Sequence, residues 1–398
     1  MSFTRPLAVI FGCSGTVLSK KERSFYADAD PLGFILFQRN CNSPKQVRQL
    51  VDSLRNAVQR PNAPVLIDQE GGRVQRLKPP HWRNIPSAST FADLYDIDRE
   101  RALKAVRLNS YLIARELFKL GISINCAPVL DLPQLGADMI IGDRAYGNST
   151  TKISALALEA CEGLLTGGVL PVIKHVPGHG RANVDSHKAL PCVEADIDTM
   201  AKSDFVPFRK MNFMPWAMTA HVLYKALDED KPATTSAKVI KMIRSQIGFD
   251  GVLLSDDLSM QALDGSLKHR TSGALAAGCD VALHCNGDMV EMTQVASGGG
   301  LLSNNAVKRI MRSENMRLKK RLPMEGTFDD LILEVANGAT VNLSQVKRID
   351  GDVYVNPVVQ STGGPANLDL LKDRSEINTG NKSQVDTELK EENRNLNE

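Results

Sequence analysis

The sequence "VLPVIKHVPGHGRANVDSH" (169–187) passes from a continuous apolar run into a loop rich in glycine and histidine. A continuous apolar run, rather than alternating apolar and polar residues, is typical of a parallel strand that is covered on both faces. Pro177, Gly178 and Gly180 prevent a regular helix directly after it. This stretch therefore predicts a buried strand whose C-terminal end carries a group of titratable side chains.

Seven further apolar runs have the same character. They are "LAVIFG" (7–12), "GFILF" (33–37), "PVLID" (64–68), "ISINCAPVLD" (122–131), "WAMTAH" (216–221), "GVLLSDD" (251–257) and "CDVALHC" (279–285). Helical patterns lie between the runs, over 43–60, 97–120, 150–165, 197–211 and 236–247. Eight strand and helix alternations within about 320 residues predict an α/β protein with a single (β/α)8 TIM-type barrel.

A doubly wound open sheet is the competing architecture. Strand counting alone separates the two poorly. The early strands, however, are not followed by a GxGxxG or GxxxxGK[ST] phosphate-binding loop, which disfavours the open sheet.

The C-terminal part of the chain differs in composition. We predict a catalytic barrel domain over residues 1–340 and a C-terminal extension over 341–398. Beyond about residue 355 the extension is polar and has no aromatic residue, so it cannot bury enough apolar surface to offset the entropy of ordering. We therefore expect a disordered tail there. Whether "DGDVYVNPVV" (350–359) packs as an extra strand or extends loosely stays open.

Overall charge excludes some classes of partner. The 48 basic and 46 acidic residues give a net charge of +2, so no global field recruits nucleic acid or a membrane surface. The N-terminal sequence has no apolar stretch of signal-peptide length, and no run is long enough to span a bilayer. We expect a cytoplasmic monomer that acts on a small molecule.

Polar side chains follow the predicted strands, where a barrel of this kind binds its ligands. In strand order they are Arg39 and Asn40; Asp68, Arg73 and Arg76; Asp131 and Arg144; Lys174, His175, Asp185 and His187; His221; Asp256 and Asp257; and His284 and Asn286. The sequence thus predicts one rim that carries carboxylates, cations and imidazoles together, as a catalytic site requires.

A metal site is the rival interpretation of the histidine-rich loop. Its four ligands would be His175, His179, Asp185 and His187. An HxxxH spacing suits a metal when both histidines lie on one helical face, and Pro177 interrupts that helix here. We expect neither a metal nor a cofactor, and we interpret His179 as a structural histidine that bonds the loop backbone.

Four motifs occur in order along the chain: "LIDQEGGRVQRL" (66–77), "IGDRAYG" (141–147), "KHVPGHGRANVDSH" (174–187) and "LLSDDLSM" (253–260). With "GFILFQRN" (33–40) and "PATTSAKVI" (232–240), they resemble the β-N-acetylglucosaminidases of glycoside hydrolase family 3, of the bacterial, cytoplasmic, cell-wall-recycling type. The resemblance spans roughly residues 5–330. It implies a retaining exo-enzyme that removes non-reducing-end N-acetylglucosamine from anhydro-muropeptides during peptidoglycan recycling.

Retaining hydrolysis needs a carboxylate nucleophile and a proton donor beside the leaving oxygen. Asp256 ends an apolar strand, and the resemblance places the nucleophile there. The side chain of Asp257 should face away, because neighbouring side chains on a strand alternate in direction. The resemblance further implies that His187 is the acid and base and that Asp185 orients its ring. An imidazole with an ordinary pKa of about 6.5 can take both parts near neutral pH.

The same resemblance implies that five side chains bind the terminal sugar: Asp68, Arg76, Arg144, Lys174 and His175. Carboxylate and guanidinium groups suit vicinal hydroxyls because each can make several hydrogen bonds. Our hypothesis for the glycine-containing loop is that it carries His187 towards and away from the pocket.

Two other functions stay open at this stage. A phosphate ion could replace water as the acceptor, since a histidine repels it less than a carboxylate would, and the protein would then be a phosphorylase. A non-catalytic sugar-binding barrel would keep the pocket without the reaction. Such a module, however, has no need of Asp256 together with a proton shuttle.

Overall fold

The computed structural model describes residues 5–134, 136–186, 189–322, 330, 346–349 and 352–355. His187 and the chain beyond residue 355 lie outside the described residues, so the roles and the disorder predicted for them stay predictions. The chain divides into two units, Met1–Val341 and Asn342–Glu398.

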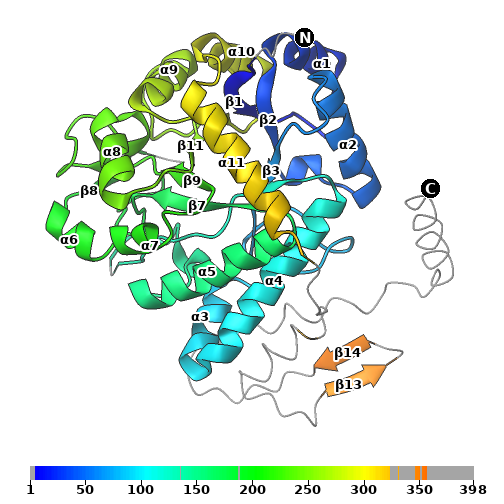
Figure 1. Ribbon diagram of the computed structural model, residues 1–398, viewed down its shortest axis with the longest axis vertical. Helices are drawn as coiled ribbons and strands as arrows, with labels where there is room; N and C mark the ends of the chain where they lie inside the picture. The colour runs from blue at the N-terminus through cyan, green and yellow to red at the C-terminus, as the bar shows by residue number, and fades with distance from the viewer. Residues whose placement is uncertain are drawn as a thin grey trace. The chain divides into compact units, whose positions relative to one another are not determined.

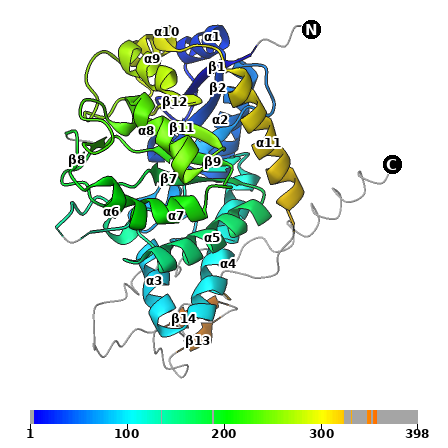
Figure 2. The same ribbon diagram turned by 60° about the vertical axis from the view of Figure 1, so that its left-hand side comes forward.

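Eight parallel strands of the first unit close into a barrel (Figures 1 and 2). They are β1 (Leu7–Phe11), β2 (Pro31–Leu36), β3 (Val65–Ile67), β6 (Ile124–Asn125), β7 (Leu170–Val176), β9 (Trp216–Thr219), β11 (Val252–Asp257) and β12 (Val281–His284). Each strand pairs with the next along the chain, and β12 closes the ring where Phe11 pairs with His284. The predicted TIM-type barrel is confirmed. The open sheet is excluded because the sheet closes on itself.

Helices surround this barrel. They are α1 (Lys20–Ala29), α2 (Pro44–Ala57), α3 (Ala88–Ile97), α4 (Arg99–Lys119), α5 (Thr150–Thr166), α6 (Ile197–Lys202), α7 (Phe205–Lys210), α8 (Ala237–Met242), α9 (Leu267–Ala277), α10 (Met289–Gly298) and α11 (Asn304–Lys320). Short helical turns are η1 (Gln38–Asn40), η2 (Gly142–Arg144), η3 (Ala233–Thr235) and the π-helical η4 (Ile243–Ile247). None of the helices in the described part of the chain is both long enough and apolar enough to cross a membrane.

Side-chain caps begin many of these helices. Ser43, Ser149 and Ser303, for example, each accept a hydrogen bond from a backbone N–H of the first turn, which satisfies a donor that has no partner within the helix. The single helix predicted over 197–211 is wrong, because the chain forms α6 and α7 instead. Pro207 explains the break, since its ring would clash with the carbonyl of Ser203 in a continuous helix.

The N-terminal end of the barrel is covered by α11, drawn in yellow in Figure 1. Apolar side chains from the barrel strands, such as Ile10, Val172 and Leu254, form a buried cluster, and Leu302 and Ala306 belong to the same cluster. Trp216, the first residue of β9, is buried there and its Nε1 donates to Ser313 Oγ on α11 at 3.0 Å. Because this end is filled by side chains, the opposite end of the barrel is where a ligand can bind.

Replacing Trp216 with alanine is expected to lower the free energy of unfolding by about 3–5 kcal/mol, since it removes a large buried ring and leaves a cavity. Chemical denaturation monitored by circular dichroism measures this loss. The matched control is Trp82→Ala, because Trp82 is only partly buried and its loss should cost less. Equal losses of unfolding free energy for the two variants would contradict the conclusion that Trp216 and α11 together fill the N-terminal end of the barrel.

Small two-stranded sheets accompany the barrel. β4 (Gln69–Gly71) pairs with β5 (Val74–Gln75), and β8 (Cys192–Val193) pairs with β10 (Leu223–Tyr224). In the second unit, β13 (Val346–Ile349) and β14 (Asp352–Val355) pair antiparallel. The open question about residues 350–359 is thus answered for 352–355, which form a strand.

Candidate active site

A cavity of about 220 Å³ lies at the C-terminal ends of the barrel strands. Its lining residues are Ile35 and Phe37 from β2 and the turn after it; Asp68, Glu70, Arg73, Val74 and Arg76 from the β3 end and the β4–β5 hairpin; Ile140, Ile141 and Arg144 from the β6–α5 connection; Lys174, His175, His179 and Ser186 from β7 and its loop; Met218 from β9; Asp256, Asp257 and Met260 from β11 and its loop; and Leu283 and Cys285 from β12 and its end. The cavity lies on the face where enzymes of this fold bind their ligands.

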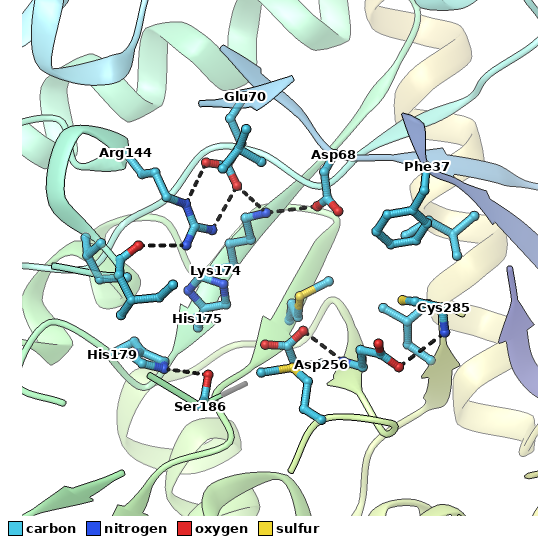
Figure 3. A pocket seen from close by; sticks show the side chains of 18 of the residues that line it. Phe37, Asp68, Glu70, Arg144, Lys174, His175, His179, Ser186, Asp256 and Cys285 are labelled. Carbon is cyan, nitrogen blue, oxygen red and sulfur yellow. Dashed lines mark hydrogen bonds and ion pairs between the residues drawn. The ribbon is translucent and has the colours of Figure 1, made fainter. Parts of the chain in front are cut away.

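Ion pairs form one wall of the cavity (Figure 3). Lys174 Nζ lies 2.6 Å from Glu70 Oε1 and 3.1 Å from Asp68 Oδ1. Arg144 donates two hydrogen bonds to the Glu70 carboxylate, each at 2.9 Å. Arg76 Nη2 donates to Asp68 Oδ2 at 3.1 Å. The structure therefore brings four of the five predicted sugar-binding residues into one network.

Electrostatics keep this network ionised. Burial by itself would raise the pKa of Asp68, but Lys174 and Arg76 lower it well below its usual range. For Glu70 the same burial is outweighed by Arg144 and Lys174, and its pKa falls to about 2. Burial acts to lower the pKa of Lys174, and the two carboxylates raise it above its ordinary value. The wall is thus a fixed set of charged donors and acceptors, suited to polar hydroxyls.

Glu70 is a site residue that the sequence reasoning missed. It lies in β4, in the motif "DQEGG" (68–72), and it contacts two of the predicted sugar-binding cations. A signal was present, because residues two apart on an extended segment point to the same side. Asp68 was already a candidate, so Glu70 at the second position beyond it should also have been one.

His175 is the fifth predicted sugar-binding residue, and Asp131 holds it in place. Asp131 Oδ2 lies 2.7 Å from His175 Nδ1, and Oδ1 accepts from the backbone N–H groups of His175 and His179 at 3.1 and 2.7 Å. Burial tends to raise the pKa of Asp131, whereas His175 lowers it and the net shift is downward. Asp131 is fully buried and does not line the cavity, so it orients the ring rather than touching a ligand.

Lys174 and His175 both line the cavity although they are neighbours on one strand. The register of β7 against β9 shifts between Lys174 and Val176, which breaks the regular alternation. Beyond the strand the loop stays tied to the β6–α5 connection. Gln134 N–H donates to Gly180 O and Asp138 N–H to Ala182 O. A Cβ on Gly180 would lie 1.9 Å from Leu132 O, so no other residue fits there.

Asp256, the predicted nucleophile, lines the cavity across from Glu70 and Arg144 (Figure 3). Its Oδ1 accepts a hydrogen bond from the backbone N–H of Asp257 at 2.8 Å. Burial tends to raise the pKa of Asp256, but the His221 and His175 rings lower it, and the net shift is downward. The structure therefore presents an ionised carboxylate to the cavity, as nucleophilic attack on an anomeric carbon requires.

Asp257 has a different environment. Its Oδ2 accepts from Ser259 Oγ at 2.7 Å, and its Oδ1 accepts from the backbone N–H groups of Ser259 and Cys285 at 3.1 and 3.2 Å. These bonds cap the turn after β11 and link it to the end of β12. The prediction that the Asp257 side chain faces away from the site is wrong, because Asp257 lines the cavity beside Asp256. The register of β11 against β12 shifts between Leu254 and Asp257, which breaks the regular alternation. The carboxylate nevertheless has structural partners.

The predicted acid and base dyad is only partly described. Ser186 lines the cavity, and the backbone carbonyl of Asp185 accepts from Ala189 N–H at 3.1 Å, but Asp185 is not a lining residue. His187 lies outside the described residues. The contact between Asp185 and His187 therefore stays a prediction.

His179 lines the cavity rather than bonding the loop backbone through its ring. Its Nε2 lies 3.3 Å from Ser186 Oγ, and its buried Nδ1 has no hydrogen-bond partner among the described residues. The prediction for its ring partner is wrong, because the serine hydroxyl takes the place expected for a backbone group. Burial, reinforced by the nearby His175, lowers the pKa of His179 to about 4.

The unfolding free energy is expected to depend on pH through His179. Because its pKa is lowered by folding, the unfolded chain binds more protons between about pH 6.5 and pH 4, and stability is lost as the pH falls through that window. The loss from near pH 7 to about pH 5 should be roughly 2 kcal/mol larger in the wild type than in His179→Gln. Denaturant titrations at both pH values measure it, and parallel pH profiles would contradict the assignment.

Several predicted rim residues serve the scaffold instead of the cavity. His221 is buried between Thr234 Oγ1 and the carbonyl of Asp257, at 2.7 and 2.9 Å. His284 Nε2 pairs with Glu291, and Asn40 donates to the carbonyls of Cys13 and Gly15. Some of the polar residues at the strand ends therefore line the cavity, and others form hydrogen bonds that hold the surrounding scaffold.

Metal binding was the rival interpretation of the loop after β7. Across the described residues, no group of three or more His, Cys, Asp and Glu side chains is arranged to hold a metal ion. His187 belonged to the proposed ligand set and lies outside those residues. The expectation that no metal is bound therefore stays a prediction.

Known proteins match this chain over most of its barrel. A β-hexosaminidase of Alkalilimnicola ehrlichii is 39% identical over 283 residues, which span 70% of this chain and 80% of that protein. A β-hexosaminidase of Methylobacillus flagellatus is 40% identical over 259 residues, 64% of this chain and 73% of that one. The crystal structure of NagZ from Neisseria gonorrhoeae with N-trifluoroacetyl-D-glucosamine matches with a TM-score of 0.73 and 28% identity, covering 85% of this chain and 99% of that one.

The sequence profile of the glycosyl hydrolase family 3 N-terminal domain matches residues 16–313, about three quarters of the chain. The resemblance read from the motifs is confirmed by this match and by the relatives. The chain belongs to glycosyl hydrolase family 3 and is a glycoside hydrolase.

Proposed function

We propose that this glycoside hydrolase is a retaining, exo-acting β-N-acetylglucosaminidase. Its relatives are named β-hexosaminidases, and the NagZ structure of similar fold was solved with an N-acylated glucosamine. The observation that carries the proposal is the ionised Asp256 carboxylate, which faces a wall of charged hydrogen-bonding groups across a small cavity. In a retaining reaction this carboxylate attacks the anomeric carbon and forms a covalent glycosyl-enzyme, which water then hydrolyses.

Exo action is supported by the size of the cavity. Its volume of about 220 Å³ is below the range of about 300–1,000 Å³ found for pockets that take drug-sized ligands. A single terminal sugar suits such a space. Asp68, Arg76, Lys174 and His175 would bind its hydroxyl and N-acetyl groups. The nitrogens of Arg144 already donate to Glu70 and to the Ile140 carbonyl, so we assign Arg144 to holding the network together.

We assign the acid and base to His187, oriented by Asp185. The support is the motif "DSH" (185–187) and the position of Ser186, which lines the cavity directly before His187 in the chain. An imidazole can donate a proton to the leaving oxygen and then accept one from the attacking water.

The cellular role that we propose is the removal of N-acetylglucosamine from anhydro-muropeptides during peptidoglycan recycling in the cytoplasm, by a monomeric enzyme. It is supported by the four motifs, which resemble those of the cell-wall-recycling enzymes of the family. The near-neutral net charge agrees with it, since this charge favours neither a nucleic-acid nor a membrane partner. Comparing kcat/KM for an anhydro-muropeptide and for chitobiose tests this role, and a clear preference for chitobiose would contradict it.

A trapping experiment tests the reaction. A fluorinated N-acetylglucosaminyl donor should accumulate as a covalent intermediate, and peptide mass spectrometry should find the label on Asp256. Proton NMR should show the β-anomer as the first product. A label elsewhere, or the α-anomer first, would contradict the retaining mechanism. Release of a sugar 1-phosphate in phosphate buffer would identify a phosphorylase instead.

A further inference from the structure

Arg73 stands at the tip of the β4–β5 hairpin and contacts a segment that lies far along the chain. We call residues 139–143, in the β6–α5 connection, the lip. The Arg73 Nη2 donates to the carbonyls of Met139, Ile140 and Ile141, the first and last at 3.1 and 3.3 Å. Its Nε donates to Asp143 Oδ1 at 2.8 Å. One guanidinium thus forms hydrogen bonds with three successive carbonyls and a carboxylate.

The lip forms part of the cavity wall. Ile140 and Ile141 line the cavity, and Ile141 packs with Val129 and Ala145 in a small apolar cluster. The carbonyl of Ile141 accepts from the backbone N–H of Arg144 at 2.9 Å, whereas the carbonyls of Met139 and Ile140 accept from side chains. The two N–H bonds of Arg73 Nη2 are shared among these three carbonyls, and Arg144 Nη1 adds a donor to Ile140 O at 3.2 Å.

The hairpin that carries Arg73 also carries Glu70. Glu70 holds the Arg144 guanidinium at one end of the lip, while Arg73 holds the lip backbone itself. The lip is therefore fixed to the same hairpin at two points. The Arg73 side chain is 44% exposed, so its ion pair with Asp143 alone would contribute little to the free energy of unfolding. The planar guanidinium fixes the position of the lip because it bonds several of the lip's acceptors at once.

We propose that Arg73 is a positioning residue for the substrate pocket: it clamps the lip to the β4–β5 hairpin and so holds Ile140, Ile141 and Arg144 in place for the bound sugar. Loss of the clamp weakens sugar binding more than it slows the reaction, since Asp256 lies on another element. The kinetic part of this inference rests on the proposed function, whereas the structural part does not.

The matched control is Arg60. Its guanidinium makes the same kind of contacts, with the carboxylate of Asp30 and with the carbonyls of Pro31 and Leu32. This cluster lies at the N-terminal end of β2, away from the cavity. Arg60→Ala therefore removes an equivalent fork of hydrogen bonds without touching the lip.

The test combines kinetics with hydrogen exchange in the full chain. For Arg73→Ala we expect KM for a chromogenic N-acetylglucosaminide to rise about tenfold while kcat changes less than about threefold. Amide exchange of the peptide covering 136–148, followed by mass spectrometry, should be faster by roughly tenfold. Arg73→Lys keeps the charge but not the planar fork and should recover less than half of the protection. Arg60→Ala should leave both readouts as in the wild type.

Three results would overturn the proposal. A raised KM with unchanged exchange of the lip would make Arg73 a direct substrate contact. Full recovery of exchange protection by lysine would show that charge alone suffices. The same rise in KM for Arg60→Ala would reduce the effect to general destabilisation. If the wild type does not act on the N-acetylglucosaminide, the proposed function fails, and the exchange measurements still decide whether the clamp exists.

Discussion

Replacing Asp256 with asparagine is expected to lower kcat for an N-acetylglucosaminide by about 10⁴–10⁶-fold, because it removes the carboxylate that we propose as the nucleophile. Asparagine has the same shape and can still accept the hydrogen bond from the Asp257 backbone N–H. The free energy of unfolding should therefore change little. Steady-state kinetics and denaturant titration of the same preparations separate the two effects.

Asp257→Asn is the matched control, one residue along the same strand. Asp257 accepts bonds from Ser259 and from the Cys285 backbone, so its replacement disturbs the turn after β11 rather than the reaction. We expect a loss of stability with a kcat that falls by no more than about tenfold. If Asp257→Asn were the less active of the two variants, the assignment of the nucleophile would be wrong.

Replacing Glu70 with glutamine should have the largest effect on stability among the cavity residues. Glu70 is the shared partner of Lys174 and Arg144, and both of these cations are almost buried. Removing its charge leaves two desolvated cations with less compensation, so we expect the free energy of unfolding to fall by about 3–5 kcal/mol. The value of kcat/KM should fall about 100-fold, because Lys174, which we propose binds the sugar, and Arg144, which holds the network together, would both shift.

Denaturant titration near neutral pH measures the loss at Glu70. Glu162→Gln is the control, since Glu162 pairs with Lys320 at 2.6 Å on a more exposed surface and should cost less than about 1 kcal/mol. The folded-state pKa of Glu70 is lowered to about 2, so its contribution is present above its ordinary pKa and is lost as the pH falls towards 2. If Glu70→Gln had the same free energy of unfolding as Glu162→Gln, the conclusion that Glu70 compensates the two buried cations would be contradicted.

The barrel could be predicted from sequence because its signal is local. Each strand, such as 169–175 or 251–257, is a continuous apolar run, and burial on both faces selects such a run directly. The position of Asp256 at the rim could be predicted because it stands at the C-terminal end of such a strand, after Leu254 and Ser255. The break between α6 and α7 was missed although Pro207 marked it, since the apolar periodicity on both sides suggested one helix.

The cavity wall was harder to predict, because its contacts join distant parts of the chain. Glu70 acquires its role from Lys174 and Arg144, which lie far along the sequence. The contacts of Arg73 with the lip cross more than 60 residues. No local pattern encodes such pairs. A polar residue can be assigned to the rim from its place after a strand, but its partner depends on how the loops pack.

The attachment of the first half of the loop after β7 has a practical consequence. Asp131, Gln134 and Asp138 hold residues 175–182 to a neighbouring connection, so this half behaves as part of the scaffold. Segments of other lengths and compositions that keep Asp185 and His187 could therefore be grafted between residues 183 and 191 while the cavity wall keeps its shape. Under the proposed function, we expect that leaving-group preference can be redesigned separately from recognition of the terminal sugar.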